Sequence, residues 1–148
     1  MIRNLEAVVL FCAAFLVPPS TSAQRVGSAH VDVLAKSTSS WNGKPYTAYP
    51  KGQPQLIVLK FTVPPHTALP WHVHSIPNAG YILLGELTLE DMATGKKQTF
   101  TSGQVFTESV DDPHRGVSGS EPAVFVVTYA DVPGTPTFIP LPGQKPEY

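Results

Sequence analysis

The stretch Trp71-His72-Val73-His74-Ser75-Ile76-Pro77-Asn78 decides how the rest of the chain is interpreted. His72 and His74 are two residues apart, so on an extended strand both side chains point to the same face and can converge on one small object. His114 follows forty residues after His74. Imidazole is the commonest protein ligand for transition metals. A histidine pair on a strand can also be merely solvated or hydrogen-bonded, so the pair alone does not establish a metal site.

Length and composition predict one domain rich in turns. A chain of 148 residues has room for a single domain with a real core. Sixteen prolines and eleven glycines favour many turns and disfavour long helices. Charged residues make up 14% of the chain and the formal net charge is -1, so nucleic acid is not expected as a partner.

Residues 1–23 have the pattern of a secretory signal peptide. Arg3 supplies a positive charge, residues 7–17 are apolar, and Thr21-Ser22-Ala23 offers small residues for cleavage before Gln24. The apolar run of eleven residues is too short for a comfortable membrane span, so no stable membrane anchor is expected. The predicted location is secreted, periplasmic or extracellular.

The single cysteine, Cys12, lies inside this segment and would be removed with it. The mature protein would then hold no disulfide and no thiolate ligand, even in an oxidising compartment. Any metal site must therefore be built from histidine, asparagine and carboxylate side chains.

From Gln24 onward the periodicity is that of short strands. Strands are predicted at residues 30–36 (as a possible edge strand), 55–63, 80–90, 97–101, 104–107 and 123–129. The chain is thus divided into an N-terminal strand and loop arm (24–54), a barrel (55–130) and a proline-rich tail (131–148) that is expected to wrap the surface. Many short strands at regular spacing predict a closed or two-sheet antiparallel barrel.

The histidine segment resembles the first motif of the cupin family. That motif runs Gly, five residues, His-x-His, three or four residues, Glu, six residues, Gly. Here His66 stands where the first Gly would be, His72 and His74 supply the pair, Asn78 takes the Glu position and Gly85 ends the motif.

The second cupin motif, which runs Gly, five residues, Pro-x-Gly, two residues, His, three residues, Asn, is matched in part. Gly103 fits its start and His114 its histidine, whereas Ser109, Asp111 and Ser118 replace the Pro, Gly and Asn. The resemblance covers residues 55 to 130 and implies an all-β fold, a single-domain cupin double-stranded β-helix or jelly-roll barrel.

The resemblance also implies that His72, His74 and His114 ligate one divalent transition metal inside the barrel: Fe, Mn, Ni, Cu or Zn. Open coordination positions would remain for water, oxygen or substrate. Asn78 is the fourth expected metal residue, and it departs from the motif because an amide oxygen is neutral and a poorer ligand than a carboxylate.

Two outcomes are open at this position. Asn78 could bind weakly or through water, giving a neutral three-histidine site, or the metal has been lost and the barrel binds only a ligand. Glu86 or Glu108 could in principle supply the missing carboxylate, although an exposed glutamate on a strand is normally just solvated.

Three further residues are candidates for a substrate pocket. Tyr81 and Phe106 could line it, although aromatic residues on barrel strands are more often plain core. Arg115 could hold a substrate carboxylate with two hydrogen bonds, although a lone surface arginine is the simpler interpretation.

Two functional hypotheses follow from the sequence. The first is a secreted mononuclear metal cupin of the oxygenase type that acts on a small organic molecule. The second is a non-catalytic periplasmic cupin that captures a metal or a small ligand. In either case the expected partner is a small molecule, and residues 31–34 could pair across a homodimer, since exposed strand edges need covering.

Overall fold

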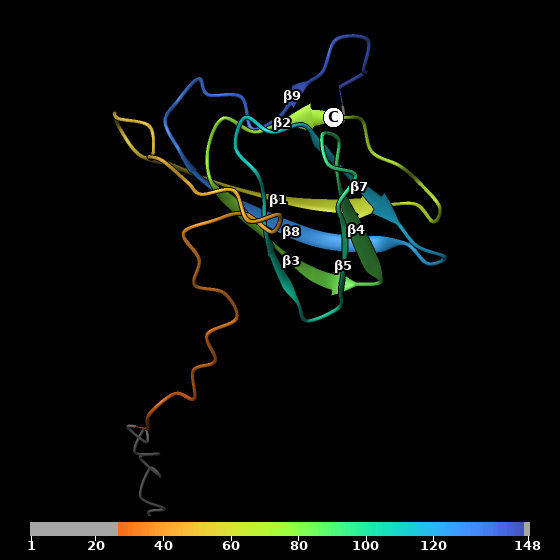
Figure 1. Ribbon diagram of the computed structural model, residues 1–148. Coiled ribbons are helices and arrows are strands. Elements are labelled where there is room, and N and C mark those ends of the chain that lie inside the picture. Colours follow the sequence, from red (N-terminus) through yellow and green to blue (C-terminus); the bar gives the residue numbers. More distant parts are fainter. Residues whose placement is uncertain (1–26, 147–148) are drawn as a thin grey trace, which may run out of the picture. The chain divides into compact units, whose positions relative to one another are not determined.

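The computed structural model describes residues 27–146, and all of their regular structure is β (Figure 1). Among the described residues, 32–146 belong to one compact unit, and this unit holds all of the strands. Within residues 27–146 no helix has the length and apolar character needed to cross a membrane. The predicted signal peptide and its cysteine lie outside the described residues and stay a prediction.

The strands form two antiparallel sheets, as the sequence predicted. The first sheet has the order β1 (Gln55–Val63), β8 (Ala123–Asp131), β3 (Asn78–Leu84) and β6 (Val105–Thr107). The second has the order β5 (Lys97–Thr101), β4 (Glu86–Asp91), β7 (His114–Ser118), β2 (His72–Val73) and β9 (Ile139–Pro140). Figure 1 shows β1, β8 and β3 side by side.

The core lies between the inward faces of these two sheets. Along β8 the residues alternate, so that Phe125, Val127 and Tyr129 are buried while the residues between them are half-buried or exposed. Leu87 and Leu89 of β4 belong to the same hydrophobic cluster. Burying each such side chain contributes about 1.5–3 kcal/mol. The alternating pattern therefore fixes which face of each strand turns inward.

The predicted strand at residues 80–90 is two strands, because Gly85 turns the chain from the first sheet to the second. Gly85 has a φ of 72°, a conformation that residues with a Cβ rarely adopt. A Cβ at this position would lie 2.2 Å from the carbonyl oxygen of Pro122. The apolar run continues through the turn, so hydrophobic periodicity alone could not reveal the break.

The edge strand predicted at residues 30–36 does not form. This segment makes no strand pairing, and large apolar side chains along it, such as Val33, are exposed. The arm instead joins the barrel further on, where the Trp41 amide donates to the Thr107 carbonyl at 2.8 Å and the indole enters the core. The homodimer predicted through residues 31–34 stays a prediction.

The proline-rich tail does more than cover the surface. Its strand β9 pairs with β2, with Ile139 opposite Val73 and Pro140 opposite His72. The Leu141 amide also donates to the Trp71 carbonyl at 3.0 Å. The two-residue strand that carries His72 is therefore held from both sides, by β7 and by the tail.

We predict that Gly85→Ala lowers the free energy of unfolding by about 3 kcal/mol, because it combines left-handed backbone strain with a clash against backbone. Gly95→Ala is the matched control, since Gly95 has a similar φ of 70° but nothing within 4 Å of its added Cβ. It should cost only about 1–2 kcal/mol. Urea unfolding measures both free energies. If Gly85→Ala and Gly95→Ala lose the same free energy of unfolding, the close approach of Pro122 is not what requires a glycine at position 85.

Candidate metal centre

The three predicted histidines come together at one end of the second sheet. His72 on β2 lies directly opposite His114 on β7 in the antiparallel register, with the two ring centroids 4.6 Å apart. His74 points to the same side as His72, and their Nε2 atoms are 3.2 Å apart. All three side chains are buried. The prediction that these residues converge on one small volume agrees with this geometry.

A carboxylate completes the cluster, and it comes from Glu108. This residue follows β6, and its Oε2 lies 2.8 Å from His74 Nε2, while its Oε1 lies 3.8 Å from His114 Nε2. The four ligand atoms of His72, His74, Glu108 and His114 all lie within 4.8 Å of one another. We call this group the four-residue cluster.

Each imidazole is oriented by a backbone carbonyl behind it. The Nδ1 atoms of His72, His74 and His114 contact the carbonyl oxygens of Pro70 at 2.9 Å, Thr137 at 2.6 Å and Asp112 at 2.7 Å. Because a carbonyl only accepts, Nδ1 carries a proton in each ring and Nε2 is directed into the cluster. Metal-binding histidines are typically oriented in this way.

Burial and mutual charge set the protonation states. Burial, together with the nearby His114 and His74, lowers the pKa of His72 to about 3, so its imidazole is neutral at neutral pH. Burial would raise the pKa of Glu108, but attraction to His74, the contact with His74 Nε2 and the nearby His114 outweigh it and hold the pKa well below its usual value. A neutral imidazole and an ionised carboxylate are the forms that bind metals.

Unsatisfied polar atoms indicate that the cluster suits a cation. His114 Nε2 is buried and makes no hydrogen bond. Buried polar atoms without a partner are uncommon in native proteins and call for an explanation such as a bound ion. A donor set of three imidazoles and one carboxylate is typical of transition-metal sites. The residues present therefore fit one divalent ion.

Asn78, the fourth expected metal residue, lies beside Glu108. Just beyond the end of the pairing of β3 with β6, the Glu108 amide donates to the Asn78 carbonyl at 3.2 Å, and on its other side Asn78 is paired with Tyr129. Neither polar atom of the buried Asn78 amide has a hydrogen-bond partner. The carboxylate missing at position 78 is thus supplied by the residue directly across the strand pair.

The second carboxylate candidate, Glu86, does not join the cluster. It begins β4, and its side chain covers Gly119, where an added Cβ would lie 2.2 Å from Glu86 Oε1. Of the two glutamates considered from the sequence, the structure brings only Glu108 to the histidines. The choice depends on the β3–β6 register, which the sequence does not display.

The three predicted pocket residues are not brought together. Tyr81 is partly exposed on the outer face of β3, and Phe106 is buried between Phe100 and Phe125 in the core. Neither lines the cavity beside the cluster.

Arg115 points away from the cluster and is already engaged. Its Nε and Nη2 each lie 2.8 Å from Glu90 Oε2, and the guanidinium stacks over the Trp71 ring at 4.4 Å. These contacts favour a structural role for Arg115, and the substrate-carboxylate role stays a prediction.

The cavity beside the cluster is small, with a volume of about 20 Å³. Its walls are mostly apolar and include Leu87, Leu89 and Val127. A space of this size holds about one water-sized molecule. In this conformation the cluster can bind an ion and a small ligand, but not a larger organic molecule.

Two segments outside the barrel strands support the cluster, and sequence reasoning missed both. In the arm, the Tyr46 hydroxyl donates to the Glu108 carbonyl at 2.7 Å. Asn42 Nδ2 donates to Asp112 Oδ2 at 2.7 Å, on the loop whose carbonyl orients His114. In the tail, the Phe138 ring lies 4.5 Å from the His72 ring. No local pattern marks these contacts, because they join residues far apart in the chain.

We predict that the metal-free protein loses stability as the pH falls from about 6.5 toward about 3. In this interval the unfolded chain protonates His72, while the folded protein keeps it neutral, so acid favours unfolding. Urea unfolding in the presence of a chelator measures the effect.

His72→Gln should weaken this dependence on pH, and His66→Gln, a change at an exposed histidine, should leave it as in the unmodified protein. If His72→Gln and the unmodified protein lose stability in parallel across the interval, the burial of neutral His72 is not the source of the acid sensitivity.

Residues 59–129 of the chain match the family model described as the cupin domain. A polyketide cyclase from Streptomyces resistomycificus is 22% identical over 58% of this chain and 60% of its own, with a TM-score of 0.50. An oxalate oxidase is 19% identical over 59% of this chain and 46% of its own, also with a TM-score of 0.50. No curated protein matches the chain.

The two solved structures are similar to this chain in fold, and at these identities the likeness extends no further. This chain spans less than two thirds of the length of either protein. One is named a cyclase and the other an oxidase, so the shared barrel does not choose the reaction.

Proposed function

This chain belongs to the cupin family through residues 59–129, and we propose that it is a mononuclear metal-dependent enzyme of the oxygenase type acting on a small organic molecule. The observation that carries the proposal is the convergence of three imidazole nitrogens and one carboxylate within 4.8 Å of one another. A second supporting observation is that a backbone carbonyl fixes each imidazole, so the ligand atoms are already aimed at one point.

His72, His74, His114 and Glu108 would hold the ion. Imidazole suits Fe, Ni, Cu and Zn, and a carboxylate suits Mn, so a mixed set favours a divalent ion such as Fe or Mn over a purely soft-ligand metal. The Glu108 charge would offset one of the two positive charges of the ion, which the neutral three-histidine alternative would leave uncompensated. A bound ion would supply Lewis acidity and, if redox-active, electron transfer.

The chain's own residues prepare the site in two ways. Glu108 and His74 lie in direct contact at 2.8 Å, so a proton held between them in the metal-free protein must leave when an ion binds. The apolar walls of the inner cavity exclude bulk water, which strengthens every electrostatic interaction inside it.

A second candidate function, a non-catalytic protein that binds a metal or a small ligand, is favoured by one observation. The inner cavity of about 20 Å³ has no room for an organic substrate without movement of its walls. Oxygen-uptake assays of the metal-loaded protein with thiols, flavonoids and dicarbonyls separate the two functions. Uptake that His114→Ala abolishes supports the enzyme, and metal binding without uptake from any of these substrates supports the binding protein.

We predict that Glu108→Gln weakens binding of Mn²⁺ or Fe²⁺ by about 100-fold or more, because it removes the one anionic ligand while keeping the size of the side chain. Removing a residue that only hydrogen-bonds to a metal ligand lowers metal affinity by about 10–100-fold, so removing a ligand itself should lower it at least as much. Isothermal titration of the chelator-treated protein measures the affinity directly.

Glu86→Gln is the matched control, since it makes the same chemical change at a glutamate outside the cluster, and it should leave the affinity unchanged. The assignment of Glu108 fails if the two variants bind metal equally well, or if Asn78→Leu rather than Glu108→Gln removes the metal.

A further inference from the structure

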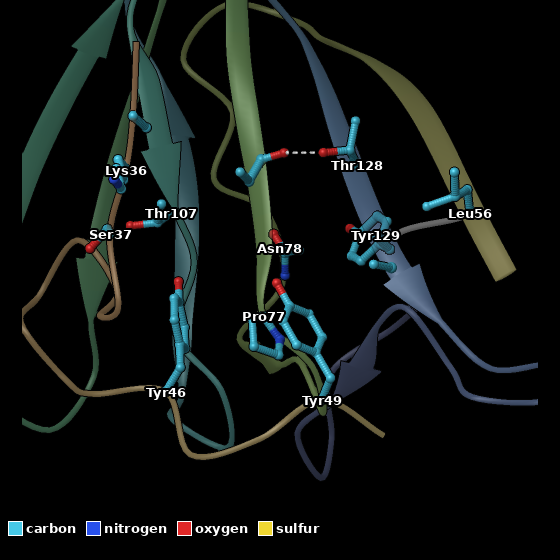
Figure 2. Close-up of a pocket in the computed structure, with 13 residues that line it drawn as sticks. Lys36, Ser37, Tyr46, Tyr49, Leu56, Pro77, Asn78, Thr107, Thr128 and Tyr129 are labelled. Carbon is cyan, nitrogen blue, oxygen red and sulfur yellow. Dashed lines mark hydrogen bonds between the residues drawn. The ribbon is translucent and has the colours of Figure 1, made fainter. Parts of the chain in front are cut away.

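A second and larger cavity lies over the outer face of the first sheet and reaches the buried Asn78 and Tyr129 at its inner side. Its volume is about 420 Å³, and it is an open hollow bordered by the arm and by strands β1, β3, β6 and β8 (Figure 2). Ala79 and Thr128, which line it, belong to the outward-facing set of their strands. Volumes of about 300–1,000 Å³ are typical of small-molecule sites. We call this space the outer cavity.

Among the described residues that line the outer cavity, Lys36 is the only one with a charged side chain. None of these lining residues is an aspartate or a glutamate. Among the described residues, no ion pair engages the Lys36 ammonium. An unbalanced positive charge in a cavity without acids selects for a negatively charged ligand.

Most of the hydroxyl donors around the cavity are already used. Four lining hydroxyls donate to backbone carbonyls at distances of 2.7 to 3.3 Å; they belong to Ser37, Tyr46, Thr107 and Thr128. The groups left to donate are the Lys36 ammonium, the Tyr49 hydroxyl and the buried Asn78 amide, whose Nδ2 has no hydrogen-bond partner. The Lys36 ammonium is the one charged anchoring point that these groups offer to an anion.

The remaining walls are apolar or aromatic. Leu56 is 81% exposed and Tyr49 is 63% exposed, although both are large side chains with much apolar surface. Figure 2 shows Tyr46 and Tyr49 on the arm and Leu56 on the strand across from them. Exposed apolar surface gathered in a concave site marks a place where a ligand or partner is bound.

We propose that the outer cavity binds a small amphipathic organic anion, a molecule with one carboxylate and an apolar body. The carboxylate pairs with Lys36, and the body lies against Tyr49 and Leu56. The proposal concerns a site separate from the four-residue cluster and does not depend on metal binding. An aromatic carboxylate and a short aliphatic carboxylate both have this chemistry, and the experiment below distinguishes between them.

The test is an isothermal calorimetric titration of the chelator-treated protein, first with 2-naphthoate and then, in a separate experiment, with octanoate. Saturable binding of either probe is expected, and the tighter of the two identifies the apolar body as aromatic or aliphatic. Lys36→Met should weaken binding about fivefold, the upper range for an exposed charge pair. It should leave the affinity for the uncharged 2-naphthalenemethanol unchanged.

Leu56→Asp should weaken binding of the anion more than tenfold, because it places a like charge in the cavity and removes an apolar wall. Val58→Asp is the matched control: Val58 is 65% exposed on the same strand and the same face, but does not line the outer cavity. Both positions are exposed, so neither change disturbs the core, and thermal unfolding verifies that each variant folds.

Three results would overturn the proposal. One is the absence of saturable binding of both probes at millimolar concentration. Another is an equal loss of affinity in Leu56→Asp and Val58→Asp, which would indicate a general surface effect. The third is loss of binding in the double variant His72→Ala/His74→Ala, which would place the carboxylate at the four-residue cluster instead.

Discussion

The pairing of His72 with His114 across β2 and β7 is the constraint on which the rest of the site depends. These residues lie forty-two positions apart in the chain, yet the antiparallel register sets them directly opposite each other. With this register in place, His74 follows on the same side and Glu108 reaches the group from the first sheet. Because β2 has only two residues, it cannot hold this register alone, and the tail strand β9 supports its other edge.

The structure places the supports of the cluster outside the strands that carry it. The arm holds Glu108 through Tyr46 and the His114 loop through Asn42, and the tail orients His74 through the Thr137 carbonyl. Tyr129 lines both the inner and the outer cavity. The arm and the tail therefore help to position the residues of the four-residue cluster.

Local patterns in the sequence predicted most of the strands, and the resemblance to the cupin family implied the set of three histidines. The strands at residues 55–63 and 97–101 form as predicted, and the spacing of His72 and His74 placed both on one face. The carboxylate could not be assigned, because Glu108 reaches the cluster only through the pairing of β3 with β6, and strand register depends on the whole sheet. The missing edge strand near Val33 has the same cause, since a strand needs a partner that its own sequence does not specify.

The central claim is that His72, His74, His114 and Glu108 bind one divalent ion. Its most direct test is an anomalous-diffraction map of crystals of the metal-loaded protein, recorded on both sides of the absorption edge of the ion. We expect a single peak about 2.0–2.3 Å from the three Nε2 atoms and a Glu108 oxygen. A peak elsewhere, or no peak after loading with Mn, Fe, Ni, Cu and Zn in turn, would contradict the claim.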